Sequence, residues 1–594
     1  MVRNSIAILP FVNLSHKQEE DYFSDGITEE IIAALSRIEE LDVTARTSSF
    51  ALKNTTLEVR EIGKRLGVLT LLEGSVRRAG TKIRISTQLV RCSDAIVIWH
   101  KRFDRELTDI FALQDEISLH IAEQVREHFG HFEIQEQLIQ EQTINVAAYE
   151  LYLKGRYHQL KWNPADLKLA IHYYEATIEK DPSFSLPYFG AALTYAILAS
   201  WSFIPHEEGN KKAHDLLATG SLIDEETYLG YGAKATLYFW GEWKFKEGHF
   251  YLQKAVGMLP LNTDAEEGLA ELYTAIGEFD RALIHVENVL SINPLSPNHY
   301  YTKGNIFYRQ KKFKEAIKYF ELALECEPRF ALAMEMIALC YVQLKNKSAL
   351  REFLARHPEM NSGTLALDFY KLLHEAHIPN QAFFEDLKGR HVLVPWMIYF
   401  YVYANQHKNA LQALKEGVAN RVGQLINFAN DPLLEPLRSK DAYKSILEAV
   451  FNGANLPNIG PVSKKSVSKD KALLTKEEAQ HFLQRLNVLM DIQKLYTSSD
   501  LSLKDLAKQL KLHPNKLSWL LNEHVHKNFN EFINNYRTKE FKRLALLPEN
   551  KHITLLGLAY ESGFNSKTVF NAYFKKSEGL TPKAWLVAQK SSEI

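Results

Sequence analysis

The chain has 594 residues, of which 46% are hydrophobic and 24% are charged, and its formal net charge is −1. This composition is ordinary for folded globular protein and excludes a disordered or fibrous chain. The length predicts about four domains. The three cysteines are too few and too scattered for a disulfide framework or a zinc site, so we expect a reducing compartment and a cytoplasmic protein.

The sequence gives little support for a signal peptide or for a membrane-spanning helix. The first residues lack the apolar core and the small-residue cleavage site of a signal peptide. Residues 182–205 contain no Lys, Arg, Asp or Glu, which raises the alternative of a membrane span. Pro187 and Gly190 interrupt this stretch, and a repeat helix is expected there. We therefore expect no membrane span.

The first 130 residues alternate between strand and helix patterns. Residues 5–12 are a short apolar run, which is typical of a strand buried on both faces. A helix is expected next, with Ser24, Asp25 and Gly26 as its cap. The further elements expected are strand 41–45, helix 57–66, strands 68–77, 82–90 and 96–103, and helix 113–129. This order predicts a compact α/β domain over residues 1–130.

No catalytic motif appears in this α/β domain. The Gly-x-x-x-x-Gly-Lys phosphate loop is absent, and His100 has no partner nucleophile that the sequence identifies. We expect no enzyme activity and no cofactor. An enzyme hidden in residues 1–130 is the disfavoured alternative, and an activity screen would be needed to revive it.

A period of 34 residues appears from about Tyr149 onward. Pro260, Pro294 and Pro328 are 34 residues apart. The same interval separates the members of three further series, namely Phe239, Tyr273 and Phe307; Phe245, Phe279 and Phe313; and Gly248, Ala282 and Ala316. This is the tetratricopeptide period, and it predicts an α-solenoid over residues 145–450. The groove of such an array commonly binds a peptide or another protein, although the array could also be a spacer that only sets geometry.

Residues 452–471 have low hydrophobicity, no periodicity and several Gly, Pro and Ser residues, so they are predicted to be a linker. A helix is expected from Thr475, which Glu478 follows at capping-box spacing. It leads into the last part of the chain, residues 472–594.

Two helix-turn-helix patterns follow one another in residues 501–585. In the first, Ser502 caps a short amphipathic helix and Pro514 opens a second helix. In the second, Thr554 and Ser566 have the corresponding cap positions. Residues 501–594 contain 15 Lys and Arg against 8 Asp and Glu, a net charge of +7, so the remaining residues carry −8. Only this end of the chain has a positive net charge, which favours binding to the phosphates of DNA.

The second helix of each pattern is expected to present a polar face to a DNA major groove, because such side chains can meet base edges and phosphates. The candidate DNA-binding residues of the first helix are Asn515, Lys516, Ser518, Trp519 and Asn522. Those of the second helix are Ser566, Lys567, Thr568, Asn571 and Lys575. A solvated helix face is the alternative for each of them.

The run from Gly563 to Pro582 resembles the signature of the AraC/XylS-type transcription regulators. It matches the Gly-Phe, Ser, Phe, Phe-Lys-Lys, Gly and Thr-Pro positions of that signature in order. Residues 529–547 resemble the linker helix of the family, although Phe541 and Lys542 depart from the small residue usual there. The resemblance implies a tandem helix-turn-helix domain that binds double-stranded DNA.

Residues 5–129 resemble the TolB-type N-terminal domain. The phrases that match are Ile8 to Phe11, Phe23 to Glu29, Leu72 to Arg78 and Asp109 to Ile117. That domain often precedes repeats in bacterial regulators. The resemblance implies an interaction or sensing module and names no ligand.

Together these patterns predict a multidomain α plus α/β chain. It has an N-terminal α/β domain, a central tetratricopeptide α-solenoid and a C-terminal all-α tandem helix-turn-helix domain. The leading hypothesis is a bacterial, cytoplasmic, sequence-specific DNA-binding transcription regulator whose other parts receive a signal or a protein partner. The alternative is a repeat scaffold that mainly binds proteins. No metal site is expected from His513, His524, His526 or His552, because no thiols or acids cluster with them. The oligomeric state, operator and inducing signal stay open.

Overall fold

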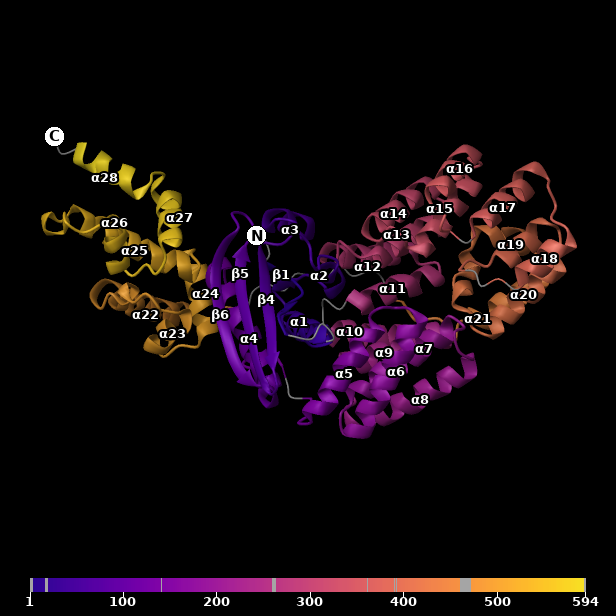
Figure 1. Cartoon of the computed structure of the whole chain (residues 1–594), viewed down its shortest axis with the longest axis horizontal. Helices are drawn as coiled ribbons and strands as arrows, with labels where there is room; N and C mark the ends of the chain where they lie inside the picture. Colours follow the sequence, from indigo (N-terminus) through magenta and orange to yellow (C-terminus); the bar gives the residue numbers. More distant parts are fainter. Residues whose placement is uncertain are drawn as a thin grey trace.

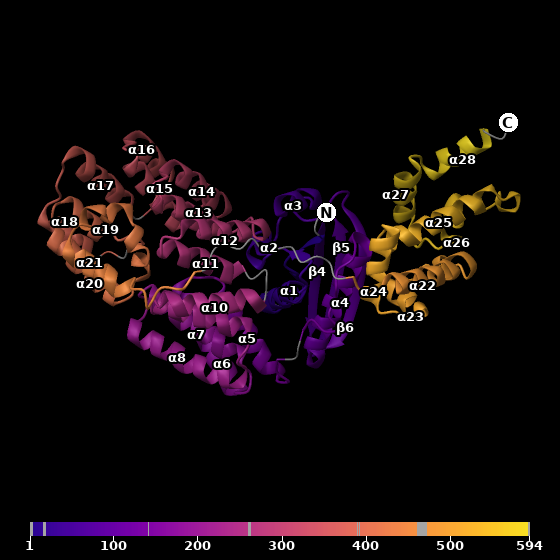
Figure 2. The same cartoon turned by 180° about the vertical axis from the view of Figure 1, so that it is seen from behind.

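The computed structural model describes residues 4–15, 20–139, 142–258, 263–360, 362–388, 390, 393–459 and 472–591. Three parts follow one another along the chain, and the N-terminal α/β part lies between the helical array and the C-terminal helices in both views (Figure 1, Figure 2). The architecture expected from the sequence is confirmed: a mixed sheet, a helical array and a group of C-terminal helices.

The α/β part is built on one mixed sheet in the order β3-β1-β4-β5-β6, with β2 paired to β4. Strands β1, β2, β3 and β4 pair in parallel, whereas β4, β5 and β6 form an antiparallel meander. The strands are β1 (Asn4–Ile8), β2 (Val12–Asn13), β3 (Leu41–Val43), β4 (Thr70–Ala79), β5 (Lys82–Arg91) and β6 (Ile96–Glu106). The helices are α1 (Asp21–Leu35), α2 (Arg46–Phe50), α3 (Val59–Leu66) and α4 (Ile110–Phe129). Strand β1 lies between β3 and β4, and its apolar residues Ile6, Ala7 and Ile8 are fully buried, as the apolar run in the sequence predicts.

The expected cap of the first helix is wrong. Helix α1 begins at Asp21, so Ser24, Asp25 and Gly26 lie inside it and not before it. The Ser24 hydroxyl donates to the Asp21 carbonyl at 3.1 Å, and the Asp25 carboxylate is buried in an ion pair with Lys53 at 2.8 Å. Small and polar residues resemble a cap in sequence, but here tertiary contacts satisfy them within the helix.

The helical array begins at α5 and ends at α21. Its helices are α5 (Val146–Gln159), α6 (Pro164–Lys180), α7 (Leu186–Ser200), α8 (His206–Ile223), α9 (Tyr228–Thr236), α10 (Phe245–Met258), α11 (Thr263–Ala275), α12 (Phe279–Ile292), α13 (Pro297–Arg309), α14 (Phe313–Cys326), α15 (Ala331–Gln343), α16 (Lys347–Arg356), α17 (Gly363–Glu375), α18 (Gln381–Lys388), α19 (Trp396–Tyr403), α20 (His407–Ala419) and α21 (Asp441–Val450). Ala282 and Ala316 are fully buried, and a Cβ on Gly248 would lie 2.7 Å from the Phe239 side chain. The small residues of the repeat therefore allow close helix crossings. Pro260 lies outside the described residues.

The charge-free stretch 182–205 forms α7, whose side chains are mostly buried in the array. Within the described ranges, no helix combines the length and the apolar character that a membrane crossing needs.

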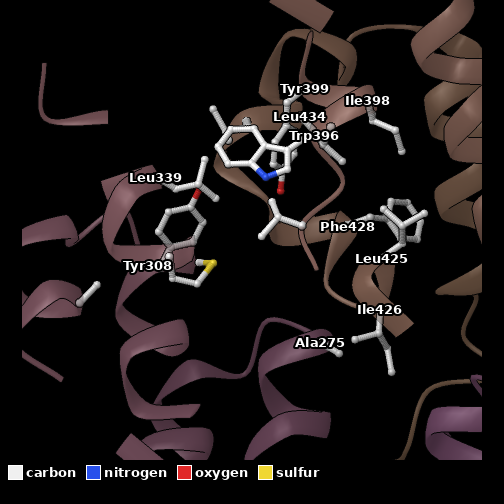
Figure 3. Close-up of a cluster of buried hydrophobic side chains, with 14 of the residues drawn as sticks. Ala275, Tyr308, Leu339, Trp396, Ile398, Tyr399, Leu425, Ile426, Phe428 and Leu434 are labelled. Carbon is white, nitrogen blue, oxygen red and sulfur yellow. The ribbon is translucent and has the colours of Figure 1, made fainter. Parts of the chain in front are cut away.

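The far end of the array folds back onto its middle. Trp396 and Tyr399 of α19 lie in one buried cluster with Phe428, Leu434 and Tyr308 (Figure 3). In the same cluster an ion pair joins Arg309 of α13 to Asp431 at 2.8 Å, and the Tyr399 hydroxyl donates to the same carboxylate at 2.6 Å. Segments more than 100 residues apart are thus fixed to one another.

The array and the α/β part share a core and a hydrogen-bonded seam. Tyr149, Tyr152 and Tyr174 of the first array helices pack in the same hydrophobic cluster as α1 and α4. The Ser48 amide donates to the Asn293 side chain at 3.0 Å, and the Leu295 amide donates to the Ser48 hydroxyl at 2.8 Å. The first two parts are therefore one continuous packed body.

The first residues of the expected linker are packed against the array. The Asn455 side chain donates to the Trp243 carbonyl at 2.9 Å, and the Lys246 amide donates to the Asn455 carbonyl at 3.0 Å. Within the predicted linker, Asn455 is therefore fixed to the N-terminal end of α10, and the linker bounds 452–471 stay a prediction. Residues 460–471 of the predicted linker lie outside the described residues.

The C-terminal part is all helical. It contains α22 (Lys476–Asn487), α23 (Leu503–Leu510), α24 (Pro514–Leu520), α25 (Phe529–Leu546), α26 (Leu555–Glu561), α27 (Lys567–Glu578) and α28 (Pro582–Ser591). The expected caps are present: Thr475 and Ser502 form capping boxes with Glu478 and Asp505.

Candidate nucleic-acid interface

The second helix-turn-helix unit consists of α26 and α27. The Thr554 side chain caps α26, accepting from the Gly557 amide at 3.0 Å, and Ser566 caps α27. Gly563 makes the turn between the helices with a φ of 97°, a conformation that favours glycine because it has no Cβ. Phe541, Phe570, Phe574 and Trp585 form the core that supports α27.

The outward face of α27 is free for a ligand. Lys567, Thr568, Asn571 and Lys575 are all exposed, and Ser566 is half-buried at the cap. These are the residues that the sequence places on this face. The neighbouring Lys576 differs from them because it pairs with Glu531 of α25 at 3.0 Å.

The first helix-turn-helix unit consists of α23 and α24. Ser502 caps α23, Lys511 turns the chain with a φ of 55°, and Pro514 is the first residue of α24. Leu517, Leu520 and Leu521 of the second helix are fully buried in the core of this unit. The local fold is therefore the one that the sequence predicts.

The outward face of α24 is not free, which corrects the expectation from sequence. Ser518 is only 3% exposed. Trp519, 8% exposed, packs in the hydrophobic core of its own unit and does not point outward as the sequence predicts. Asn515 and Ser518 of α24 and Asn522 of the π-helical turn that continues it (Leu521–Val525) are spaced three and four residues apart, so they form one stripe. The end of the α/β domain lies against this stripe, and Lys516 beside it is half-buried.

We call residues 126–134, which end α4 and follow it, the covering segment. Arg126 donates a hydrogen bond to the Asn515 side-chain oxygen. The Asn515 side chain also exchanges two hydrogen bonds with the backbone of Ile134, donating to its carbonyl at 3.3 Å and accepting from its amide at 3.4 Å. A Cβ on Gly130 would lie 3.2 Å from the Asn522 side-chain oxygen, so the backbone passes close to α24 here.

Two further contacts hold the covering segment to the C-terminal part. The Glu127 carboxylate accepts a hydrogen bond from the Leu503 amide at 2.8 Å, at the N-terminus of α23. The Asn528 side chain donates to the His128 carbonyl at 2.9 Å. Burial raises the pKa of Glu127 to about 7, and it lowers the pKa of His128 to about 4.

Helix α25 connects the two units. Its Arg537 is buried and donates to the Tyr496 carbonyl at 2.8 Å and to the Ser498 carbonyl at 2.7 Å. Burial lowers the pKa of Arg537 to about 10. The Tyr573 hydroxyl of α27 donates to the Glu531 carbonyl at 3.0 Å, which joins the second unit to the same helix. These buried contacts fix the spacing between α24 and α27.

The sequence did not indicate the covering segment, and it indicated no metal site. The histidines at 513, 524, 526 and 552 belong to no cluster of potential metal ligands, and the described ranges contain no group of three or more such side chains.

Two helix-turn-helix units on one connecting helix define the class of this part as a DNA-binding domain. Residues 506–587 match a family model described as "Helix-turn-helix domain", of the AraC type. Residues 2–119 match "HilA/YgeH-like transcriptional regulator, second domain", and residues 297–330 match "Tetratricopeptide repeat". The chain thus combines the domains of a DNA-binding transcription regulator with repeats of a protein-interaction type. The TolB-type resemblance of the N-terminal domain stays a prediction.

Among curated proteins, "Putative adenylate cyclase 3" of Rhizobium meliloti (strain 1021) is 38% identical over 205 residues, which are 34% of this chain and 34% of that protein. This chain therefore matches about a third of the length of that relative.

Solved structures with similar helical arrays include PilW, titled a widely conserved type IV pilus biogenesis factor. It is 16% identical and covers 38% of this chain and 99% of its own, with a TM-score of 0.32. Human IFIT1 is 17% identical and covers 58% of this chain and 77% of its own, with a TM-score of 0.33.

Proposed function

We propose that this protein is a sequence-specific transcription regulator that binds double-stranded DNA through α24 and α27. The observation that supports this most is the exposed face of α27, where Asn571, Thr568 and two lysines stand on a rigid aromatic core. Amide and hydroxyl groups on such a helix can meet base edges, and lysines can meet phosphates. The net charge of +7 over residues 501–594 supports the same ligand.

The two helices are suited to successive segments of one groove. Recognition helices on a rigid frame contact major-groove segments about one helical turn, or about 34 Å, apart. Arg537 and Tyr573 supply the rigid frame here, because both make hydrogen bonds that join the units through α25. We propose that Asn571 contacts base edges and that Lys575 contacts a backbone phosphate.

The α/β domain and the helical array are proposed to be signal-binding or partner-binding modules of the regulator. Their shared core supports this role, since a ligand of either part can act on both. We propose that the protein works in the bacterial cytoplasm and that it is not an enzyme. The absence of a Gly-x-x-x-x-Gly-Lys loop from the sequence supports the latter proposal.

A selection of bound duplexes from a random pool by the full chain, followed by gel-shift titration at two salt concentrations, tests the function. Lys575→Ala is expected to weaken binding to all sequences alike and to reduce the slope of log affinity against log salt by about one. Asn571→Ala is expected to relax discrimination at one base-pair position. Lys576→Ala is the matched control, because Lys576 already pairs with Glu531 and its loss should have a smaller effect.

The proposal would be contradicted if the selection enriched no sequence and if the Lys575 and Asn571 variants bound nonspecific DNA as the wild type does. That outcome would favour the repeat-scaffold alternative instead.

A further inference from the structure

The contacts of Asn515 imitate those of an asparagine that reads a base. Asparagine recognises adenine by donating to one ring-edge group and accepting from another in a bidentate pair. Here the Asn515 side chain donates to the Ile134 carbonyl at 3.3 Å and accepts from the Ile134 amide at 3.4 Å. One residue of the covering segment thus offers Asn515 the same donor and acceptor pattern.

A side-chain oxygen of Glu127 accepts from an amide that a DNA phosphate could otherwise use. In a helix-turn-helix the first helix crosses the DNA backbone, and helix N-termini bind phosphate oxygens through free amides. The Leu503 amide at the start of α23 instead donates to the Glu127 carboxylate at 2.8 Å, and Glu127 is only 7% exposed. A phosphate and this carboxylate cannot accept from the same amide at once.

The charge around these contacts is also that of DNA. Besides Glu127, residues 115–136 contain five carboxylates, Asp115, Glu116, Glu123, Glu133 and Glu136, against one basic residue, Arg126; of the five, Glu116 pairs with Arg105 at 2.7 Å. A cavity of about 550 Å³ between α4 and α23 is lined by several of these acids and by Lys504. Lys504 of the positively charged part of the chain therefore lies beside acidic residues of α4.

We infer that the covering segment is an intramolecular DNA mimic that restrains the first helix-turn-helix unit. This inference rests on the proposed DNA binding and names its regulation. A major groove about 12 Å wide holds a helix through its outward face. On α24 and the turn that continues it, that face comprises Asn515, Ser518 and Asn522, and the covering segment contacts Asn515 and Asn522. In this closed arrangement α24 cannot enter a groove, whereas Lys567, Thr568, Asn571 and Lys575 of α27 stay exposed.

Release of the covering segment would expose both reading helices. A ligand or partner that favours the released arrangement by its binding would therefore raise DNA affinity, because it shifts the population toward the competent state. The α/β part that holds the covering segment shares its core with the array. A signal received by the array thus has a continuous packed route to α4.

The test uses the full chain with two opening variants in the α/β domain, neither of which alters the DNA-binding part. Glu127→Lys removes the carboxylate and places a cation at the N-terminus of α23, where it is unfavourable. Arg126→Ala removes the donor to Asn515. Glu127→Gln is the matched control, since its amide oxygen can still accept from Leu503 and the closed arrangement should persist. Hydrogen exchange over residues 501–528 measures release, and gel shift on the selected duplexes measures affinity.

Both opening variants should speed exchange over residues 501–528 but not over residues 554–578, and should bind DNA at least tenfold more tightly than the wild type. Glu127→Gln should bind no more tightly than the wild type. Faster exchange without tighter binding would overturn the restraint, and unchanged exchange in both variants would overturn the docking itself. If no variant binds any duplex while exchange responds as expected, the proposed function fails and the docking stands, so the two failures are distinguishable.

Discussion

Gly563→Ala should detach the second helix-turn-helix unit from its frame. A Cβ at this position would lie 2.2 Å from the Tyr496 carbonyl oxygen and 2.8 Å from the Thr497 Cα, and both atoms are backbone. The positive φ of 97° costs an alanine about 1–2 kcal/mol. The Tyr496 carbonyl is also the acceptor of Arg537, and losing a hydrogen bond to a charged group costs about 1.5–3 kcal/mol. The expected destabilisation is therefore about 2.5–5 kcal/mol.

Gly579→Ala is the matched control. Its φ of 72° is also positive, but a Cβ there would meet nothing within 4 Å. Only the backbone cost of about 1–2 kcal/mol remains. Hydrogen exchange of the full chain over residues 496–505 and 560–578 should then be faster in Gly563→Ala than in Gly579→Ala by about tenfold to a hundredfold, which corresponds to about 1.5–3 kcal/mol. Equal exchange in the two variants would refute the steric reasoning.

Three further predictions follow from buried charges. Burial raises the pKa of Glu127 to about 7, so the protonated form favours the closed arrangement and this stabilisation is lost as the pH rises through about 7. The DNA affinity of the wild type relative to Glu127→Gln should therefore grow between about pH 5 and 7 and then level off. A ratio of affinities that stays constant with pH would contradict this prediction. His128 and His131 titrate alike in both proteins, so the ratio isolates Glu127. Arg537→Met should leave the Tyr496 and Ser498 carbonyls without their donor and destabilise the joint between the units by about 1–3 kcal/mol, measured by urea-dependent hydrogen exchange; protection equal to the wild type would contradict this. Asp431→Asn should lower the free energy of unfolding by about 3–5 kcal/mol, because it leaves Arg309 buried without its charge partner. Lys311→Ala, in the exposed pair with Glu435, is the control and should change the unfolding midpoint little. Equal midpoints for the two variants would show that the buried pair does not stabilise the fold.

The parts of the fold that depend on nearby residues could be predicted from the sequence. Ser502 and Thr554 cap their helices as expected, because a cap joins a side chain to an amide three residues away. The tetratricopeptide period is equally local, since each repeat packs on its neighbour. The cap expected at Ser24 was wrong because burial and hydrogen bonds inside α1 satisfy the same polar residues.

The candidate site could be predicted only in part. The exposed face of α27 follows from its own periodicity: Lys567, Thr568, Asn571 and Lys575 are exposed, while Ser566 is half-buried at the cap. Their role in DNA binding stays a prediction. The face of α24 has the same kind of pattern, yet Arg126 and Asn515 are 389 residues apart in sequence and no local signal joins them. Contacts between distant parts depend on how whole domains dock, which helix periodicity does not encode.

The central claim is that this protein binds DNA with two reading helices, of which the first is covered until the covering segment leaves. Hydroxyl-radical footprinting of the full chain on a selected duplex tests it most directly. The wild type should protect mainly the segment read by α27, and Glu127→Lys should extend protection by about one helical turn, or about 10 base pairs. The same footprint from both proteins would contradict the account.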